Sequence, residues 1–224
     1  EERSWKQLNF NTSKILKFLK KINIKKGDRV AAYMPNTIET VEAFIATTSL
    51  GCIWSSCSPD FGSKGVIERF SQINPKILFI TDQYFYNGKK IEVLKRLSAI
   101  LKSIPSIKSV VITNYPGKKF VKNKNKFKKV NLFKWNKLME TNDEKINFKR
   151  FDFETELAIL YSSGTTGKPK CICHRSGGVL IQHMKEHQLH CNIKENDNVF
   201  YFTTCGWMMW NWLVSSLASK ASIV

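Results

Sequence analysis

The sequence predicts an α/β fold in which a mainly parallel β-sheet is flanked by helices. Short apolar segments alternate along the chain with longer segments whose apolar residues recur at helical spacing. Glycine, proline and asparagine residues separate these segments, as is typical of turns between regular elements. The 224 residues are 42% hydrophobic, so one large core or two small ones can form.

The first half of the chain reads as a helix followed by a β-α-β-α-β unit. We expect helices over residues 4–22, 38–50 and 66–73, and strands over 29–34, 52–56 and 76–81. Thr37 is placed to cap the second helix and Gly51 to end it, and Val41, Phe44 and Ile45 are expected on its core face.

The second half continues this alternation after one interruption. We expect helices over 91–104, 132–139 and 176–190, and strands over 107–113 and 157–161. Residues 114–130 carry seven lysines and few apolar residues, which predicts a loop or insertion. The run 200–212 reads as a core strand and a helix start, and the last four residues read as a strand just begun. Because the chain also starts with Glu1, we expect it to be a fragment of a longer protein.

The chain is strongly basic, with 36 Lys and Arg against 18 Asp and Glu and a net charge of +18. Such a charge fits either a polyanion partner or lysines spread over solvated surfaces. The lysine-rich segment 114–130, with two phenylalanines, would suit a nucleic-acid arm. No recognised nucleic-acid module accompanies it, so we expect solvated surface and no specific nucleic-acid partner.

Six cysteines without paired spacing do not resemble a disulfide framework, which favours a reducing compartment such as the cytosol. The longest apolar stretch, residues 206–218, is too short and too polar to span a bilayer, and no targeting leader opens the chain. We therefore expect a soluble cytoplasmic protein that does not bind membranes.

A phosphate-binding loop is predicted directly after the apolar strand 157–161. It consists of Ser162, Ser163, Gly164, Thr165, Thr166, Gly167, Lys168, Pro169 and Lys170. The glycines let backbone N–H groups approach an anion, the four hydroxyls donate to phosphate oxygens, and Lys170 supplies a positive charge. The Walker pattern is excluded for two reasons. Its glycines are farther apart than Gly164 and Gly167 are in this sequence, and Lys168 is followed by a proline instead of a serine or threonine.

This loop, YSSGTTGKPK at residues 161–170, resembles the signature of the adenylate-forming superfamily of acyl-CoA synthetases, luciferases and peptide-synthetase adenylation domains. The resemblance implies that the chain is part of the large N-terminal domain of such an enzyme. It also implies that the loop holds the β- and γ-phosphates of ATP while a carboxylate attacks the α-phosphate, with Lys170, Thr165 and Thr166 as catalytic residues.

Residues 54–62, 171–190 and 200–219 are similar to the branch of this superfamily that activates acetoacetate. This similarity implies ATP, CoA and acetoacetate as substrates, with acetate or propionate as the alternative acids. The aromatic run 200–212 is more typical of a pocket wall than of pure core. By resemblance, Trp207 closes the acyl pocket, Met208 and Met209 contact the acyl chain, and Gly206 lets it approach the backbone. A wholly apolar pocket would desolvate the β-ketone, so Asn211 or a tryptophan N–H is expected to donate to it.

The family's CoA-binding stretch corresponds here to Tyr86, Asn87, Gly88, Lys89 and Lys90, with Tyr86 in place of the family's first arginine. Lys89 and Lys90 are then the expected phosphate contacts. The family's acidic Mg²⁺ motif, its ribose-binding Asp and its C-terminal domain with the adenylation lysine would lie beyond residue 224. We therefore expect this chain alone to be inactive.

A zinc hydrolase is the competing enzyme class. His183, Glu186 and His187 fit the H-x-x-E-H pattern, and His190 adds a third imidazole near the same helical face. Cys171, Cys173 and His174 would be further ligands. The two cysteines, however, alternate on an expected strand, short His/Glu patterns arise by chance, and the resemblance explains the same residues without a metal.

Overall fold

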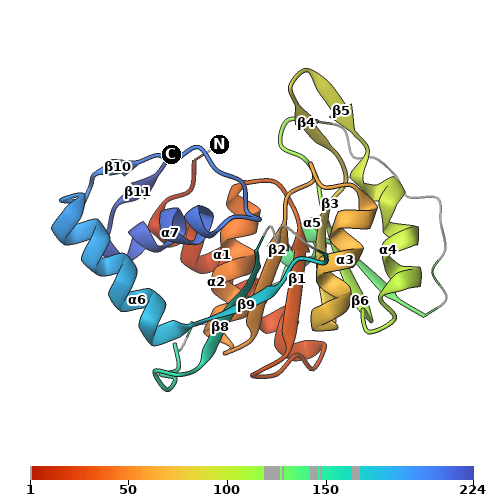
Figure 1. The fold of residues 1–224 in the computed structure, drawn as a ribbon, viewed down its shortest axis with the longest axis horizontal. Helices are drawn as coiled ribbons and strands as arrows, with labels where there is room; N and C mark the ends of the chain where they lie inside the picture. Colours follow the sequence, from red (N-terminus) through yellow and green to blue (C-terminus); the bar gives the residue numbers. More distant parts are fainter. Residues whose placement is uncertain (1, 119–126, 128, 142–145, 147, 163–166) are drawn as a thin grey trace.

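A seven-stranded sheet forms the centre of the protein (Figure 1). The computed structural model describes residues 2–118, 127, 129–141, 146, 148–162 and 167–224. The strand order is β7-β6-β3-β1-β2-β8-β9, and every neighbouring pair is parallel except β8 and β9. The predicted α/β class is therefore confirmed.

The central strands are β1 (Arg29–Tyr33), β2 (Ile53–Cys57), β3 (Ile77–Thr81), β6 (Ser109–Thr113), β7 (Asn131–Lys134), β8 (Glu156–Tyr161) and β9 (Cys171–Arg175). The helices around them are α1 (Trp5–Lys21), α2 (Ile38–Ser49), α3 (Ser63–Ile73), α4 (Leu97–Ser103) and α5 (Trp135–Met139). The helices and strands expected for residues 4–81 all form, with ends within three residues of the prediction.

Helices cover both faces of the sheet because successive strand residues point to opposite sides. In β1, Val30 and Ala32 pack in the core that faces α1, α2 and α5, whereas Ala31 and Tyr33 pack in the core that faces α3 and α4. All four residues are fully buried. This two-sided burial explains why the strand reads as a continuous apolar run.

Two sequence predictions in this region are corrected. Residues 84–91 form a hairpin of β4 (Tyr84–Tyr86) and β5 (Lys89–Ile91), so the helix expected from residue 91 begins later, with a 3₁₀ turn (Val93–Arg96) before α4. The helix expected over 132–139 is shorter, because residues 131–134 instead extend the sheet beside β6. The apolar residues 132 and 133 do not distinguish these alternatives, since a short run fits either element.

The core face of α2 also differs from the prediction. Ala43 and Ala46 are fully buried, whereas Val41 and Phe44 only pack against the core and Ile45 is half-buried. Small residues occupy the closest contact because α2 lies tightly against its neighbours, and the larger side chains reach around it.

Residues 176–223 form a second cluster at one end of the sheet (Figure 1). It contains α6 (Ser176–Lys185), a π-helical turn (Glu186–His190), α7 (Met208–Ser215), a 3₁₀ turn (Ser216–Ser219) and a small parallel pair, β10 (Asn198–Val199) with β11 (Ser222–Ile223). The predicted helix 176–190 and terminal strand are confirmed, but residues 200–207 form no strand.

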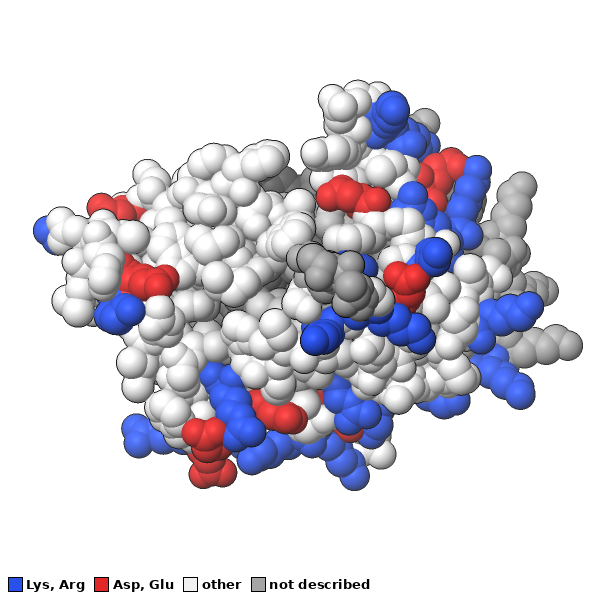
Figure 2. Space-filling model, in the orientation of Figure 1, with Lys and Arg blue, Asp and Glu red and all other residues white. Residues whose placement is uncertain are grey.

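The surface of the second cluster carries few charges, whereas Lys and Arg gather on the lower and right-hand parts of the view in Figure 2. None of the helices among the described residues combines the length and apolar character needed to cross a membrane. The lysine-rich segment 114–130 lies mostly outside the described residues.

Candidate functional site

The predicted phosphate loop connects β8 to β9 at the carboxyl end of β8. Ligands of open α/β sheets bind at this edge. The backbone N–H of Ser162 donates to the carbonyl of Lys170 at 3.0 Å, which closes the base of the loop. Gly167 adopts φ +106°, a conformation that side chains disfavour, so a glycine is needed there. Ser163, Gly164, Thr165 and Thr166 lie outside the described residues.

The strand that leads into this loop is tied to its neighbour. The Ser55 hydroxyl of β2 lies 3.0 Å from the Tyr161 hydroxyl and donates to the carbonyl of Ile159 at 2.8 Å. Burial raises the pKa of Tyr161, so its phenol stays protonated. The loop therefore starts from a fixed position, while Lys168 and Lys170 on its far side are exposed and accessible to an anion.

The predicted acyl-binding segment lies beside the carboxyl end of β2, the strand next to β8. A Cβ added to Gly206 would lie 3.5 Å from the backbone nitrogen of Ser58 and 3.5 Å from the ring of Phe61. Because β2 and β8 are adjacent and parallel, the structure brings the acyl segment and the phosphate loop to the same edge of the sheet.

The aromatic run divides into exposed and core residues. Trp207 and Met208 are 55% and 44% exposed, and Met209 is half-buried. Trp210 is fully buried, stacks against Trp54 at 6.3 Å between ring centroids, and donates from Nε1 to Asn36 Oδ1 at 2.8 Å. Only the start of the run is thus accessible to a substrate, and the Trp210 N–H is already used.

Unpaired polar atoms gather near this segment. Asn211 is 8% exposed, and its Oδ1 has no hydrogen-bond partner in the described structure. The hydroxyls of Ser58 and Thr204 are also buried without a partner. Buried polar atoms are normally bonded, so these orphans are candidates for contact with a polar ligand. The unpaired atom of Asn211 is an acceptor, whereas a ketone oxygen needs a donor, so donation from the Asn211 amide N–H to the β-ketone stays a prediction.

The predicted CoA residues occupy the β4–β5 hairpin. Asn87 and Gly88 both have positive φ, at +47° and +71°, which is the conformation of a two-residue hairpin turn. Tyr86, Lys89 and Lys90 are exposed, and Lys90 lies 3.8 Å from Glu92. The Asn-Gly pair is the sequence signal that could have predicted this hairpin.

The residues of the zinc hypothesis serve other roles. His183 is 5% exposed, its Nδ1 lies 2.7 Å from Ser215 Oγ, and burial together with His187 lowers its pKa to about 4. His187 is fully buried with its ring 4.5 Å from that of Trp212. Glu186 accepts a hydrogen bond from Gln182 at 2.6 Å.

Over the residues that the structure places, no three His, Cys, Asp or Glu side chains form a group able to hold a metal ion. These placed residues include Cys171, Cys173, His174 and His190. The zinc hydrolase hypothesis is therefore not supported, and we assign no Mg²⁺ ligand here either.

Two residues that the sequence reasoning missed hold the loop after β2. Arg96 donates to the carbonyls of Pro59 and Phe61 at 2.9 and 2.8 Å and to the hydroxyl of Tyr33, which itself donates to Phe61. Burial raises the pKa of Tyr33, with Arg96 opposing this shift. No local sequence signal links residues 33, 59 and 96, because the contact exists only after folding.

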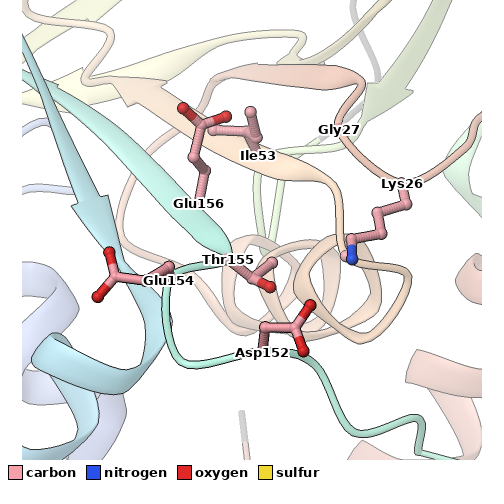
Figure 3. Close-up of a pocket in the computed structure, with 8 residues that line it drawn as sticks. Lys26, Gly27, Ile53, Asp152, Glu154, Thr155 and Glu156 are labelled. Carbon is pink, nitrogen blue, oxygen red and sulfur yellow. The ribbon is translucent and has the colours of Figure 1, made fainter.

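The cavities of the described structure lie away from the predicted site residues. A cavity of about 250 Å³ opens at the amino ends of β1, β2 and β8, where Lys26, Asp152, Glu154 and Glu156 line it (Figure 3). A larger hollow of about 550 Å³ lies at the carboxyl end of β6. Neither of these two cavities contains a residue of the phosphate, acyl or CoA sets.

The chain is similar to known proteins over most of its length. Acetoacetyl-CoA synthetase of Gallus gallus is 46% identical over 208 residues, which cover 92% of this chain and 31% of that protein. Acetoacetyl-coenzyme A synthetase of Rhizobium meliloti is 45% identical over 220 residues, covering 98% and 33%. The solved structure of acetoacetyl-CoA synthetase from Streptomyces lividans matches with a TM-score of 0.89 at 34% identity, covering 99% of this chain and 33% of that one.

The chain thus spans about a third of the length of these relatives. Across residues 1–224 it also matches the protein family described as AMP-binding enzyme. The resemblance inferred from the phosphate loop is confirmed: the chain belongs to the AMP-binding enzyme family.

Proposed function

We propose that these residues form the truncated N-terminal AMP-binding domain of a longer acid–thiol ligase that converts acetoacetate, ATP and CoA to acetoacetyl-CoA, AMP and pyrophosphate. The observation that carries the proposal is the loop of glycines, hydroxyls and Lys170 at the carboxyl end of β8. Similarity to acetoacetyl-CoA synthetases over nearly the whole chain supports acetoacetate as the acid.

The reaction has two displacement steps. A carboxylate oxygen of acetoacetate attacks the α-phosphorus of ATP, and pyrophosphate leaves, which gives an acyl-adenylate. The CoA sulfur, losing its proton, then attacks the acyl carbonyl carbon, and AMP leaves. Lys170 and the loop N–H groups neutralise and align the departing pyrophosphate, which lowers the barrier of the first step.

The acid is recognised at the start of the aromatic run. Trp207 limits the chain length, Met208 and Met209 contact the short chain, and Gly206 leaves room beside Ser58 for the substrate. Asn211 donates to the β-ketone through its amide N–H. The exposed Lys89 and Lys90 of the β4–β5 hairpin contact CoA phosphates.

Mg²⁺, when bound with ATP, supplies further positive charge to the phosphates, and its protein ligands are expected in the rest of the protein. All six cysteines of the chain are free, which fits the reducing cytosol.

The test is product analysis with the full-length protein. We expect acetoacetate, ATP and CoA to yield AMP, pyrophosphate and acetoacetyl-CoA, and formation of ADP instead of AMP would refute the mechanism. Comparing kcat/KM for acetoacetate, acetate and propionate decides between the proposed substrate and its short-acid alternatives. The Lys170→Ala variant is the control that links the activity to the loop.

A further inference from the structure

Helix α3 contacts the described ends of the phosphate loop and also the loop next to the acyl segment. We propose that Arg69 of α3 is a positioning residue that holds these two parts of the site in a fixed relation, and that Gln72 assists it. This inference rests on the proposed function, because it assigns a role within the same reaction. Neither residue belongs to the phosphate, acyl or CoA sets above.

On the acyl side, Arg69 acts through Phe61. Its guanidinium lies 4.3 Å from the centroid of the Phe61 ring, a cation–π contact. The same ring also lies beside Gly206, whose added Cβ would lie 3.5 Å from Phe61 Cε2. Arg96 holds the carbonyl of Phe61 at 2.8 Å, so the backbone and the ring of this residue are each fixed by an arginine.

On the nucleotide side, the same guanidinium lies 5.8 Å from the ring centroid of Tyr161, the last residue of β8 before the phosphate loop. One turn further along α3, Gln72 Nε2 donates to the carbonyl of Pro169 at 2.9 Å. Residues 69 and 72 lie on one face of the helix because they are three positions apart. That face therefore contacts the chain just before and near the end of the loop.

The orientation of Arg69 is itself fixed. Its Nη1 donates to the carbonyl of Gly65 at 3.0 Å, and the side chain is half-buried. A planar guanidinium can stack on a ring and donate to a carbonyl at the same time, whereas a lysine ammonium keeps the charge but not the fork. If the phosphate loop shifts relative to the acyl segment, attack on the α-phosphate loses alignment, and small misplacements are costly in such a reaction.

The experiment measures the two half-reactions separately in the full-length protein. Adenylation is measured as the acetoacetate-dependent exchange of labelled pyrophosphate into ATP. Thioester formation is measured as the reaction of synthetic acetoacetyl-adenylate with CoA. For Arg69→Met we expect the KM for ATP in the exchange assay to rise about fivefold or more. Thioester formation should stay within about twofold of the parent. Arg69→Lys should recover only a small part of the loss, because it keeps the charge but not the planar fork. Gln72→Ala should change the same KM in the same direction by a smaller factor.

Arg29→Met is the matched control, because Arg29 also holds a carbonyl of α3, that of Ile73 at 2.8 Å, but at the opposite edge of the sheet. It should leave the KM for ATP unchanged. The proposal is overturned if Arg69→Met and Gln72→Ala leave that KM unchanged, or if Arg29→Met raises it as much. It is also overturned if both half-reactions fall in parallel. A parent protein without exchange activity would instead refute the proposed function, so the two failures are distinguishable.

Discussion

Trp207 and Trp210 are three residues apart, yet the structure predicts different consequences when each is removed. Trp210 is fully buried between Trp54 and Phe44, with ring centroids 6.3 and 5.5 Å away. Replacing it with alanine leaves a cavity, for which about 3–5 kcal/mol is typical. The loss of its hydrogen bond adds little, because Asn36 is exposed and can bond to water instead.

Trp207 is 55% exposed, so less than half of its surface is buried and water fills the space it leaves. A tryptophan buries at most about 250 Å², so at about 25 cal/mol per Å² the buried part of Trp207 contributes at most about 3 kcal/mol. Thermal melts of the 224-residue chain, followed by circular dichroism, should show the difference. Trp210→Ala should lower the Tm by roughly 6–20 °C, and Trp207→Ala by less, at most about 6–12 °C.

Kinetics complete the test, because a pocket wall sets specificity and a core residue does not. In the full-length protein, Trp207→Gly should shift kcat/KM from acetoacetate toward medium-chain acids, by at most about 0.8 kcal/mol for each newly buried CH₂. A folded variant that keeps the parent's chain-length preference would show that the acyl pocket lies elsewhere. Equal destabilisation by the two alanine substitutions would refute the division of the run into exposed and core residues.

Three further predictions test the loop, a buried histidine and the fold. Lys170→Ala should lower kcat/KM by an amount that corresponds to about 2–4 kcal/mol of activation free energy, while Lys168→Ala should leave kcat/KM nearly unchanged. If neither substitution lowered kcat/KM, the phosphate-site assignment would be contradicted. The pKa of His183 is about 4 in the folded state and about 6.5 in the unfolded state. As the pH falls, the unfolded chain therefore binds a proton at His183 before the folded protein does. Stability should therefore fall by about 2–3 kcal/mol as the pH drops from 7 to 4.5, and His183→Gln should reduce this dependence in urea titrations, which it would not do if His183 were exposed. A thiol reagent at pH 8 should label three cysteines rapidly, and it should label the buried Cys52, Cys57 and Cys205 only on unfolding. Rapid labelling of more than three cysteines would contradict the fold.

The raised pKa values of the buried thiols strengthen the last prediction. Burial raises the pKa of Cys52 and of Cys57 to about 12, and that of Cys205 above its usual range. Thiolate is the reactive form, so these three cysteines are protected both by packing and by protonation. Cys171, Cys173 and Cys191 are exposed and serve as the internal reference.

The sequence by itself determined the α/β class and the first elements of the sheet, and it predicts the phosphate loop. Each of these depends on local signals. Apolar runs such as 29–33 and 77–81, each bounded by turn residues, favour buried strands, and the glycine and hydroxyl pattern of 162–170 favours anion binding. The similarity to acetoacetyl-CoA synthetases extends over nearly the whole chain.

Only the tertiary structure decided which residues surround that loop. The sequence does not reveal that Arg69 lies against Tyr161, or that Arg96 holds the carbonyl of Phe61, because these residues belong to segments that only the strand order β3-β1-β2-β8 places side by side. Periodicity likewise could not separate Trp207 from Trp210, since both belong to one aromatic run. The burial of an aromatic side chain depends on what packs against it, and at Trp210 that is Trp54 and Phe44, more than 150 residues earlier in the chain.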